Sequence, residues 1–172
     1  MPRASTEIQN RSVEMAQITS IVYQPVGMTY GENRQDYLRL PLESARLIAG
    51  QGIDGDQKAG SHPDRQLNLL SYEWLQALAL QGYRTAPGQF GEQLIVQGLP
   101  LLELQPGDRL QLGDQAVIEI TKPRTGCDRL ERAQRGKPVV GHLGPLGQLA
   151  KVTHGGTIRV GDPVVQLSPE SR

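Results

Sequence analysis

Apolar and polar residues alternate in several short stretches of the chain, and this alternation predicts a protein built mainly from β-strands. Residues 18–27 carry β-branched and aromatic side chains at strand spacing, so we expect the first strand there. Residues 37–40 and 45–49 indicate two further strand pieces, joined by a proline-containing kink. Two alternating runs on either side of Gly113 and Asp114 have the pattern of a β-hairpin.

The C-terminal part of the chain repeats this pattern. Residues 150–167 alternate around two glycine-containing turns, the first at Gly155 and Gly156 and the second at Gly161 and Asp162. We therefore expect further strands that pair in the same hairpin fashion.

One segment has helical periodicity. Ser71 is a candidate N-cap, Glu73 falls in the first turn, where the helix dipole favours an acid, and Gly82 is a stop signal. The residues at the spacing of one helix face are Trp74, Leu75, Leu78 and Ala79. This pattern predicts an amphipathic helix that lies on the sheet.

The fold class follows from these elements. Twenty glycines and twelve prolines are scattered as turn signals and do not gather in a linker, which favours many short strands. We expect a mainly β (α+β) protein, a bent β-barrel with a few short helices. At 172 residues the chain suits a single domain, predicted here over residues 18–168 after a flexible N-terminal arm of residues 1–17.

The composition excludes several classes of partner. Eighteen basic residues balance eighteen acidic ones, which argues against nucleic acid or an anionic membrane as a bulk partner. No apolar run approaches the ~20 residues of a membrane span, and the polar N-terminus lacks the hydrophobic region of a signal peptide. With a single cysteine as well, the chain is expected to be cytoplasmic.

That single cysteine, Cys127, is either a small buried apolar residue or a reactive thiol, because it cannot close an intramolecular disulfide. Asp128 and Glu131 have the spacing of a capping box, which predicts that Cys127 lies just before a helix that Asp128 caps. Lys122, Arg124 and Arg129 surround the thiol in sequence. Basic neighbours on a strand-to-helix loop favour a reactive thiolate, and we therefore expect Cys127 to be accessible and reactive.

Two other stretches are rich in glycine and charge. Residues 52–71 include Asp56, Lys58 and Arg65, and residues 87–94 form a tight glycine-rich turn. Either stretch is a plain loop or a site where backbone amides and basic side chains approach an anionic group. Neither matches a Walker loop or a dinucleotide fingerprint.

Taken together, four stretches resemble the MOSC family, the domain named for the C-terminal part of molybdenum cofactor sulfurases. The stretches are "GIDGD…RQLNLLS", "GQFGEQL…GL…L…L…GDRLQLG", "ITKPRTGC" and "GGTIRVGD". They occur in the family's order and spacing from about Ile18 to Leu167, with Cys127 at the position of the family's cysteine.

The resemblance implies a MOSC-like bent barrel that binds the molybdenum cofactor (molybdopterin) or a related sulfur-bearing group. Cys127 is then the catalytic residue, as a sulfur carrier in the form of a persulfide or as a molybdenum ligand. The residues predicted to bind the cofactor are Asp56, Lys58, Arg65, Gly91, Glu92, Gln93, Lys122 and Arg124. We expect residues 52–65, 90–94 and 122–128 to converge on one pocket, with Arg124 as a surface residue whose loss leaves the fold intact.

Three functional readings remain open at this point. The first is an enzyme or enzyme component: a sulfur transferase, or a cofactor-dependent reductase of N-hydroxylated compounds. The second is a non-catalytic module that binds the cofactor, and the third is a structural domain with an inert thiol. Larger family members carry a pyridoxal-phosphate-dependent cysteine desulfurase or electron-transfer modules. This chain is therefore expected to need a cysteine desulfurase or an electron-transfer protein as partner, whereas the sequence does not fix its oligomeric state.

Overall fold

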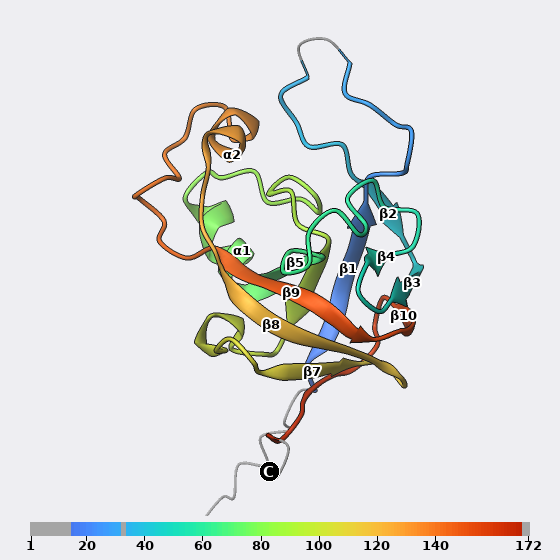
Figure 1. The fold of residues 1–172 in the computed structure, drawn as a ribbon. Coiled ribbons are helices and arrows are strands. Elements are labelled where there is room, and N and C mark those ends of the chain that lie inside the picture. The colour runs from blue at the N-terminus through green and yellow to red at the C-terminus, as the bar shows by residue number, and fades with distance from the viewer. Residues whose placement is uncertain (1–14, 32–33, 170–172) are drawn as a thin grey trace, which may run out of the picture.

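The computed structural model describes residues 15–31 and 34–169 and consists mostly of strands (Figure 1). The strands are β1 (Gln17–Tyr23), β2 (Leu40–Leu42), β3 (Ser44–Ile48), β4 (Gly52–Ile53), β5 (Leu67–Ser71), β6 (Leu94–Gln97), β7 (Arg109–Leu112), β8 (Ala116–Arg124), β9 (Gly147–His154), β10 (Gly156–Arg159) and β11 (Val164–Gln166). The helices are α1 (Tyr72–Leu80), the 3-10 helix η1 (Leu101–Glu103) and α2 (Asp128–Ala133).

The strands form one large and one small sheet. The eight-stranded sheet has the order β11-β7-β8-β9-β5-β6-β1-β2, and the three-stranded sheet has the order β10-β3-β4. The β5–β6 pair is parallel, whereas the other strand pairs are antiparallel. The predicted mainly β class with a few short helices is confirmed.

The large sheet is strongly bent but is not closed into a barrel. Its edge strands are β11 and β2, which are not paired with each other. An isolated bridge joins Gln17 at the start of β1 to Pro163, just before β11, and the Ile18 amide donates to the Asp162 carbonyl oxygen at 2.9 Å. The two ends of the sheet therefore approach each other without a continuous ladder.

The first predicted strand is present as β1, whereas the second is displaced: residues 37–39 are not in a strand, and β2 covers Leu40–Leu42. The kink between β2 and β3 has a structural reason. β2 pairs with β1, whereas β3 pairs with β10 and β4 in the other sheet. The single residue between them, Glu43, thus marks the point where the chain passes from the large sheet to the small one.

The hairpin predicted around Gly113 and Asp114 is confirmed, because β7 and β8 pair antiparallel. The C-terminal strands also form, but β9, β10 and β11 do not pair with one another as the repeated pattern suggested. A Cβ atom at Gly155 would lie 2.8 Å from the Leu47 carbonyl oxygen. Glycine therefore lets the chain pass directly against β3, and β10 joins that strand instead of folding back on β9.

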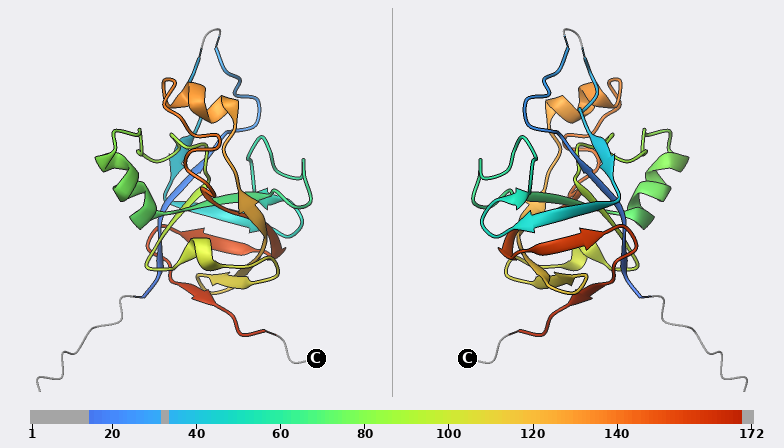
Figure 2. Two further views of the ribbon diagram at one scale, coloured as in Figure 1. Left: turned by 90° about the vertical axis from the view of Figure 1, so that its left-hand side faces the viewer. Right: turned by 90° about the vertical axis from the view of Figure 1, so that its right-hand side faces the viewer.

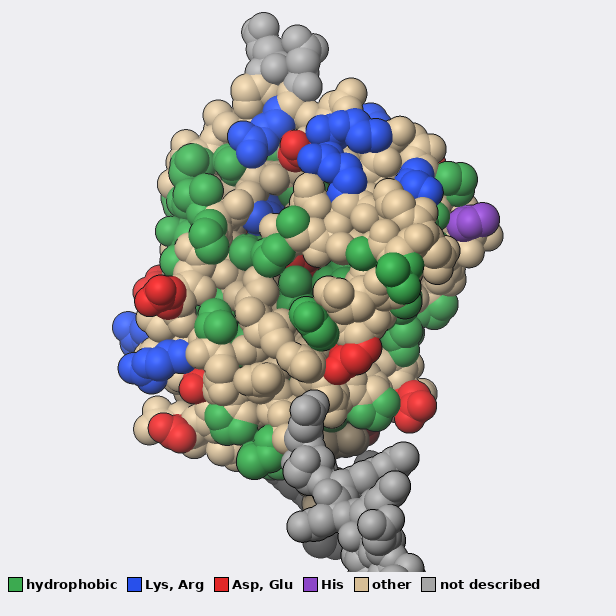
Figure 3. Space-filling model, turned by 180° about the vertical axis from the view of Figure 1, so that it is seen from behind, with side chains coloured by type: hydrophobic (Ala, Val, Ile, Leu, Met, Phe, Trp, Pro, Cys, Tyr) green, Lys and Arg blue, Asp and Glu red, His purple; other side chains and the backbone are tan. Residues whose placement is uncertain are grey.

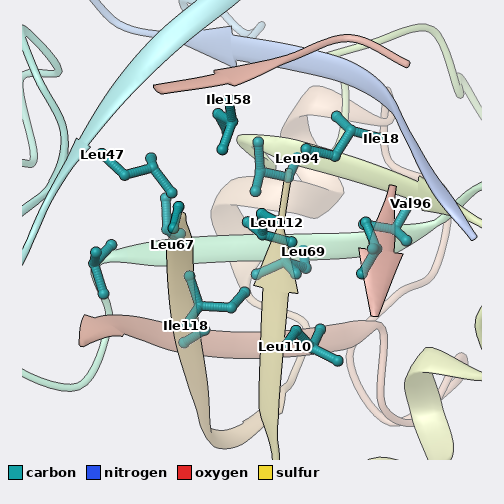
Figure 4. Packing of buried hydrophobic residues seen from close by; sticks show 14 of the residues in the cluster. Ile18, Leu47, Leu67, Leu69, Leu94, Val96, Leu110, Leu112, Ile118 and Ile158 are labelled. Carbon is teal, nitrogen blue, oxygen red and sulfur yellow. The ribbon is translucent and has the colours of Figure 1, made fainter. Parts of the chain in front are cut away.

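The core occupies both faces of the central strands. On one face, leucines and isoleucines of β5, β6, β7 and β8 interdigitate with Ile18, Leu47 and Ile158 (Figure 4). On the other face, Leu70 and Ile95 pack with the buried side of α1 and with Leu130 of α2. Strands that are buried on both faces read as nearly continuous apolar runs, as β5 and β6 do.

Helix α1 forms where its signals placed it. The Ser71 hydroxyl accepts a hydrogen bond from the Trp74 amide at 3.2 Å, so Ser71 is the N-cap, and Gly82 follows the helix at a φ of 85°. Leu75 and Leu78 are buried as expected, Trp74 is half-buried, and Ala79 is exposed.

The capping box predicted for α2 is wrong. The N-cap residue is Cys127, not Asp128. The Glu131 carboxylate accepts hydrogen bonds from the Val139 and Val140 amides, each at 2.9 Å, and these bonds hold it away from the start of the helix. The loop that follows α2 returns over the helix and offers two free amides, which is why the carboxylate turns toward the loop.

One end of the molecule gathers the segments that matter for function. The connection between β1 and β2 and the helix α2 lie at the same end of the molecule in all three ribbon views (Figures 1 and 2). Of the predicted arm, residues 1–14 lie outside the described residues, and Gln17 already belongs to β1. Among the residues that the structure describes, no helix is long and apolar enough to cross a membrane.

Candidate functional site

Cys127 is exposed at the junction between β8 and α2. The Tyr37 hydroxyl interacts with the thiol through a hydrogen bond. Burial raises the pKa of Tyr37 to about 12, and the neighbouring Cys127 contributes in the same direction. The phenol therefore stays protonated at neutral pH and is available as a donor to the sulfur.

Arg124, the last residue of β8, is buried beside this thiol and is 7% exposed. Its Nη2 donates to the Phe90 carbonyl oxygen and its Nη1 to Asn68 Oδ1 at 3.3 Å. Burial lowers the pKa of Arg124, whereas Tyr37, Glu92 and Cys127 oppose that shift. The guanidinium thus links the strand that leads to Cys127 with the glycine-rich turn, which corrects the expectation that Arg124 is a surface residue.

Glu92 is the acidic member of that turn and is 1% exposed. Its carboxylate accepts from the Gly88 amide at 2.6 Å and from the Phe90 amide at 3.2 Å. Burial raises the pKa of Glu92, and the amide bonds and nearby Arg124 oppose that rise. Glu92 is therefore a residue that shapes the turn and balances the charge of Arg124, with its oxygens already occupied by backbone donors.

Asp56 and Gln93 hold neighbouring loops together in the same interior layer. Gln93 Nε2 donates to Asp56 Oδ2 at 3.4 Å, and Gln93 Oε1 accepts from the Asn68 amide at 2.8 Å. The Gln24 amide donates to Asp56 Oδ1 at 3.1 Å. Both side chains are buried, so their contacts fix the loops around the site and do not face an incoming ligand.

Lys58 extends the positive charge of the site. Burial lowers the pKa of Lys58 first, and Arg39 and Arg124 lower it further, while Tyr30 and Asp56 oppose them. Cations that lie close together are stabilised when an anion binds between them. The structure thus brings Lys58, Glu92, Arg124 and Cys127 to one region, as the sequence predicted.

Two predicted residues lie elsewhere. Lys122 is exposed and lines a separate hollow of about 230 Å³ with Asp64, Thr121 and Lys151. The Thr121 hydroxyl donates to the Asp64 carbonyl oxygen at 2.6 Å, which places exposed Arg65 beside that hollow. Neither Lys122 nor Arg65 is among the strongest electrostatic influences on Arg124, Lys58 or Tyr37.

The connection between β1 and β2 supplies residues that sequence reasoning did not assign to the site. Arg39 Nη2 donates to the Gly91 carbonyl oxygen at 3.1 Å, and its Nε is buried with no partner. Tyr30 and Tyr37 lie under guanidinium groups, and Arg129 lies over both rings. The only signal in the sequence is "DYLRL", where Tyr37 and Arg39 alternate with leucines, and this alternation by itself predicts a strand and no binding site.

Asp36 ties this connection to the two helical segments. Its Oδ1 lies 2.7 Å from Arg84 Nη1 and 3.1 Å from Arg135 Nη1, and its carbonyl oxygen accepts from Arg129 Nη2 at 3.2 Å. Arg135 adopts a φ of 59°, a conformation that is uncommon for residues other than glycine. The pKa of Asp36 is lowered by its hydrogen bonds to Arg135 and Arg84.

The surface at this end is basic although the whole chain is neutral. Figure 3 shows Lys and Arg side chains gathered near the upper end of the molecule, with one acidic side chain among them. Two open hollows adjoin the region, one of about 490 Å³ that includes Arg34, Asp36 and Arg135, and one of about 620 Å³ that includes Asp128 and Arg135. In the described part of the chain, no group of three or more His, Cys, Asp or Glu residues could hold a metal ion.

The chain belongs to the MOSC domain family, whose model matches residues 56–165. The matched range includes the glycine-rich turn, β8 and Cys127, whereas the connection that carries Tyr30, Tyr37 and Arg39 precedes it. No curated protein matches the chain.

Solved structures with the same fold come from several bacteria. YiiM from Geobacillus stearothermophilus is 21% identical with a TM-score of 0.70, over 89% of this chain and 75% of that one. YiiM from Escherichia coli is 23% identical with a TM-score of 0.65, over 91% and 72%. YuaD from Bacillus subtilis is 18% identical with a TM-score of 0.62, over 87% and 94%. At these identities, the likeness establishes a shared fold.

Replacing Arg124 by alanine is expected to lower the free energy of unfolding by about 2–4 kcal/mol, because it removes two hydrogen bonds and leaves the buried Glu92 without its neighbouring cation. Lys122→Ala, two residues earlier in the same strand but exposed, is the matched control and should change stability by less than about 0.5 kcal/mol. Urea unfolding of both variants measures the difference. Equal stability of the two variants would show that Arg124 does not join the strand to the turn.

Asp36→Asn should lower the melting temperature at neutral pH by an amount that corresponds to less than about 1 kcal/mol, because the carboxylate is 41% exposed and solvent screens its ion pairs. The folded-state pKa of Asp36 is depressed, so its contribution is present above the usual value of 3.8 and is lost as the pH falls through the folded value. Thermal melts of wild type and variant should therefore converge in acid. A difference that persists well below pH ~3 would mean that the carboxylate charge is not responsible.

Proposed function

We propose that this MOSC-domain protein is a cytoplasmic sulfur carrier in which Cys127 bears a persulfide. The observation that carries this proposal is an exposed thiol that contacts a protonated phenol and lies beside the buried cation of Arg124. The thiolate is the form that attacks sulfur, and cationic and hydrogen-bonding groups beside an exposed thiol suit this chemistry. The cysteine is the only one in the chain, so no second thiol could resolve the persulfide as an internal disulfide.

The transfer step balances without an external oxidant. The Cys127 thiolate attacks the outer sulfur of a persulfide on a donor protein, a new S–S bond forms at Cys127, and the donor's S–S bond breaks to release its thiolate. A pyridoxal-phosphate-dependent cysteine desulfurase is the class of partner that generates such a persulfide from cysteine. An acceptor thiolate then attacks the outer sulfur, a new S–S bond forms on the acceptor, and the S–S bond at Cys127 breaks to leave the Cys127 thiolate behind.

A second candidate function is binding of the molybdenum cofactor, and the contacts of Arg39 favour it. A buried Nε with no partner, next to the mutually repelling charges of Lys58 and Arg124, fits an anionic group such as the phosphate of a pterin. Lys58 and Arg39 would hold that phosphate, and Cys127 would be the protein ligand of molybdenum. When bound, the cofactor supplies two-electron redox chemistry for reducing an N-hydroxylated compound, with electrons from a separate electron-transfer protein.

The proposal is tested by incubating the purified chain with a cysteine desulfurase and cysteine, followed by intact-mass spectrometry. We expect the mass to rise by one sulfur atom, the added sulfur to be lost on reduction, and no change in Cys127→Ala. Iodoacetamide labelling of the untreated protein is the control for accessibility. A thiol that labels readily yet never gains sulfur would contradict the carrier function.

The same measurement under native conditions separates the second candidate. Protein produced in a host that makes the molybdenum cofactor is expected to carry the cofactor mass if the Arg39 and Lys58 region binds it. Arg39→Gln should then lose the cofactor while Cys127 still accepts sulfur from the desulfurase. Sulfur loading without any bound cofactor would contradict the second candidate and support the carrier function.

A further inference from the structure

Tyr37 occupies the centre of the residues around Cys127. Its ring lies so close to Gly91 that a Cβ atom there would come within 2.6 Å of the ring carbons, and Gly91 has a φ of 72°. Glycine is therefore required for two independent reasons, the close approach of the ring and the left-handed backbone. The ring is held in place by this packing and by burial.

Two guanidinium groups from different segments meet at this ring. The Cζ atom of Arg129, in α2, lies 5.1 Å from the ring centroid, and that of Arg39, at the end of the β1–β2 connection, lies 5.5 Å from it. Both distances are within the range of an attractive cation–π contact. Arg39 is additionally fixed by the Gly91 carbonyl oxygen, and Arg129 by that of Asp36.

The same tyrosine directs its hydroxyl to Cys127, so the two arginines are placed by a residue that also contacts the thiol. Two like charges would otherwise move apart and become fully hydrated. A fixed ring between them holds both cations at the residue whose hydroxyl interacts with the thiol.

We infer that Tyr37 is a positioning residue whose ring holds Arg39 and Arg129 around Cys127 and thereby makes the thiol select anionic reactants. This inference rests on the proposed role of Cys127 as the reacting group. The reactant class that follows is a persulfide or sulfur acceptor that carries carboxylate or phosphate groups next to its sulfur. Neutral reactants of equal size gain nothing from the two guanidinium groups.

The test compares two disulfide reagents that report the same thiol, the dianionic disulfide of thionitrobenzoate and neutral dithiodipyridine. The ratio of their rates cancels the exposure and thiolate fraction of Cys127, which a merely structural change would alter for both reagents. At low ionic strength, this ratio should exceed that of a neutral model thiol by about ten-fold and should fall as salt is added.

Tyr37→Met fills the space without an aromatic face and should reduce the ratio by about three-fold or more, whereas Tyr37→Phe should retain it. Arg129→Gln should also reduce the ratio. Lys151→Gln, which removes one positive charge from the Glu119 ion pair on β9, is the matched control and should leave the ratio unchanged. Circular dichroism establishes that each variant is folded.

If Tyr37→Met does not fold, a polyfluorinated phenylalanine at position 37 gives the same test, because fluorination keeps the ring shape and weakens its attraction for cations. Its ratio should fall below that of Tyr37→Phe. An unchanged ratio in the folded non-aromatic or fluorinated variant would overturn the role of Tyr37. Failure of wild-type Cys127 to react even with neutral dithiodipyridine would instead contradict the proposed function.

Discussion

The burial of one charged side chain, Arg124, organises this end of the molecule. A guanidinium out of contact with water is stable only when its donors are satisfied and its charge is compensated. Phe90 and Asn68 accept its hydrogen bonds, and Glu92, whose own oxygens are held by the Gly88 and Phe90 amides, provides the opposite charge. Strand β8 and the glycine-rich turn must therefore keep a fixed relation, and Cys127 follows Arg124 by three residues.

The sequence was sufficient to predict the fold class and much of the strand pattern, because local signals decide those features. Ser71 as a helix cap and the hairpin at Gly113 are examples in which side-chain chemistry within a few residues fixes the structure. The errors came from distant partners. Glu131 had the correct spacing for a capping box, but its carboxylate binds the amides of Val139 and Val140, which local spacing does not reveal.

The candidate site shows the same division. Cys127, Glu92 and Arg124 were identified from motifs, yet the burial of Arg124 could not be predicted from its sequence neighbours, Pro123 and Thr125. Tyr37 and Arg39 were overlooked because the segment they belong to is brought to Cys127 only by tertiary contacts, through Asp36 and Gly91. By charge alone, Lys122 and Arg65 were as good candidates as Arg124 and Lys58. Only the folded structure shows that Lys122 lines a separate hollow.

A neutral chain with a concentrated positive end has a functional consequence. Arg39, Lys58 and Arg129 do not form ion pairs with carboxylates among the described salt bridges. Burial lowers the pKa of Lys58, and the neighbouring Arg39 and Arg124 lower it further. Two acids of this end are already engaged, Asp36 by two arginines and Glu131 by two amides. Because the fold holds these cations together while Asp36 and Glu131 are occupied elsewhere, an anion from outside the chain is the natural complement. The thiol of Cys127, which lies at this basic end, will therefore encounter anionic reactants more often than neutral ones.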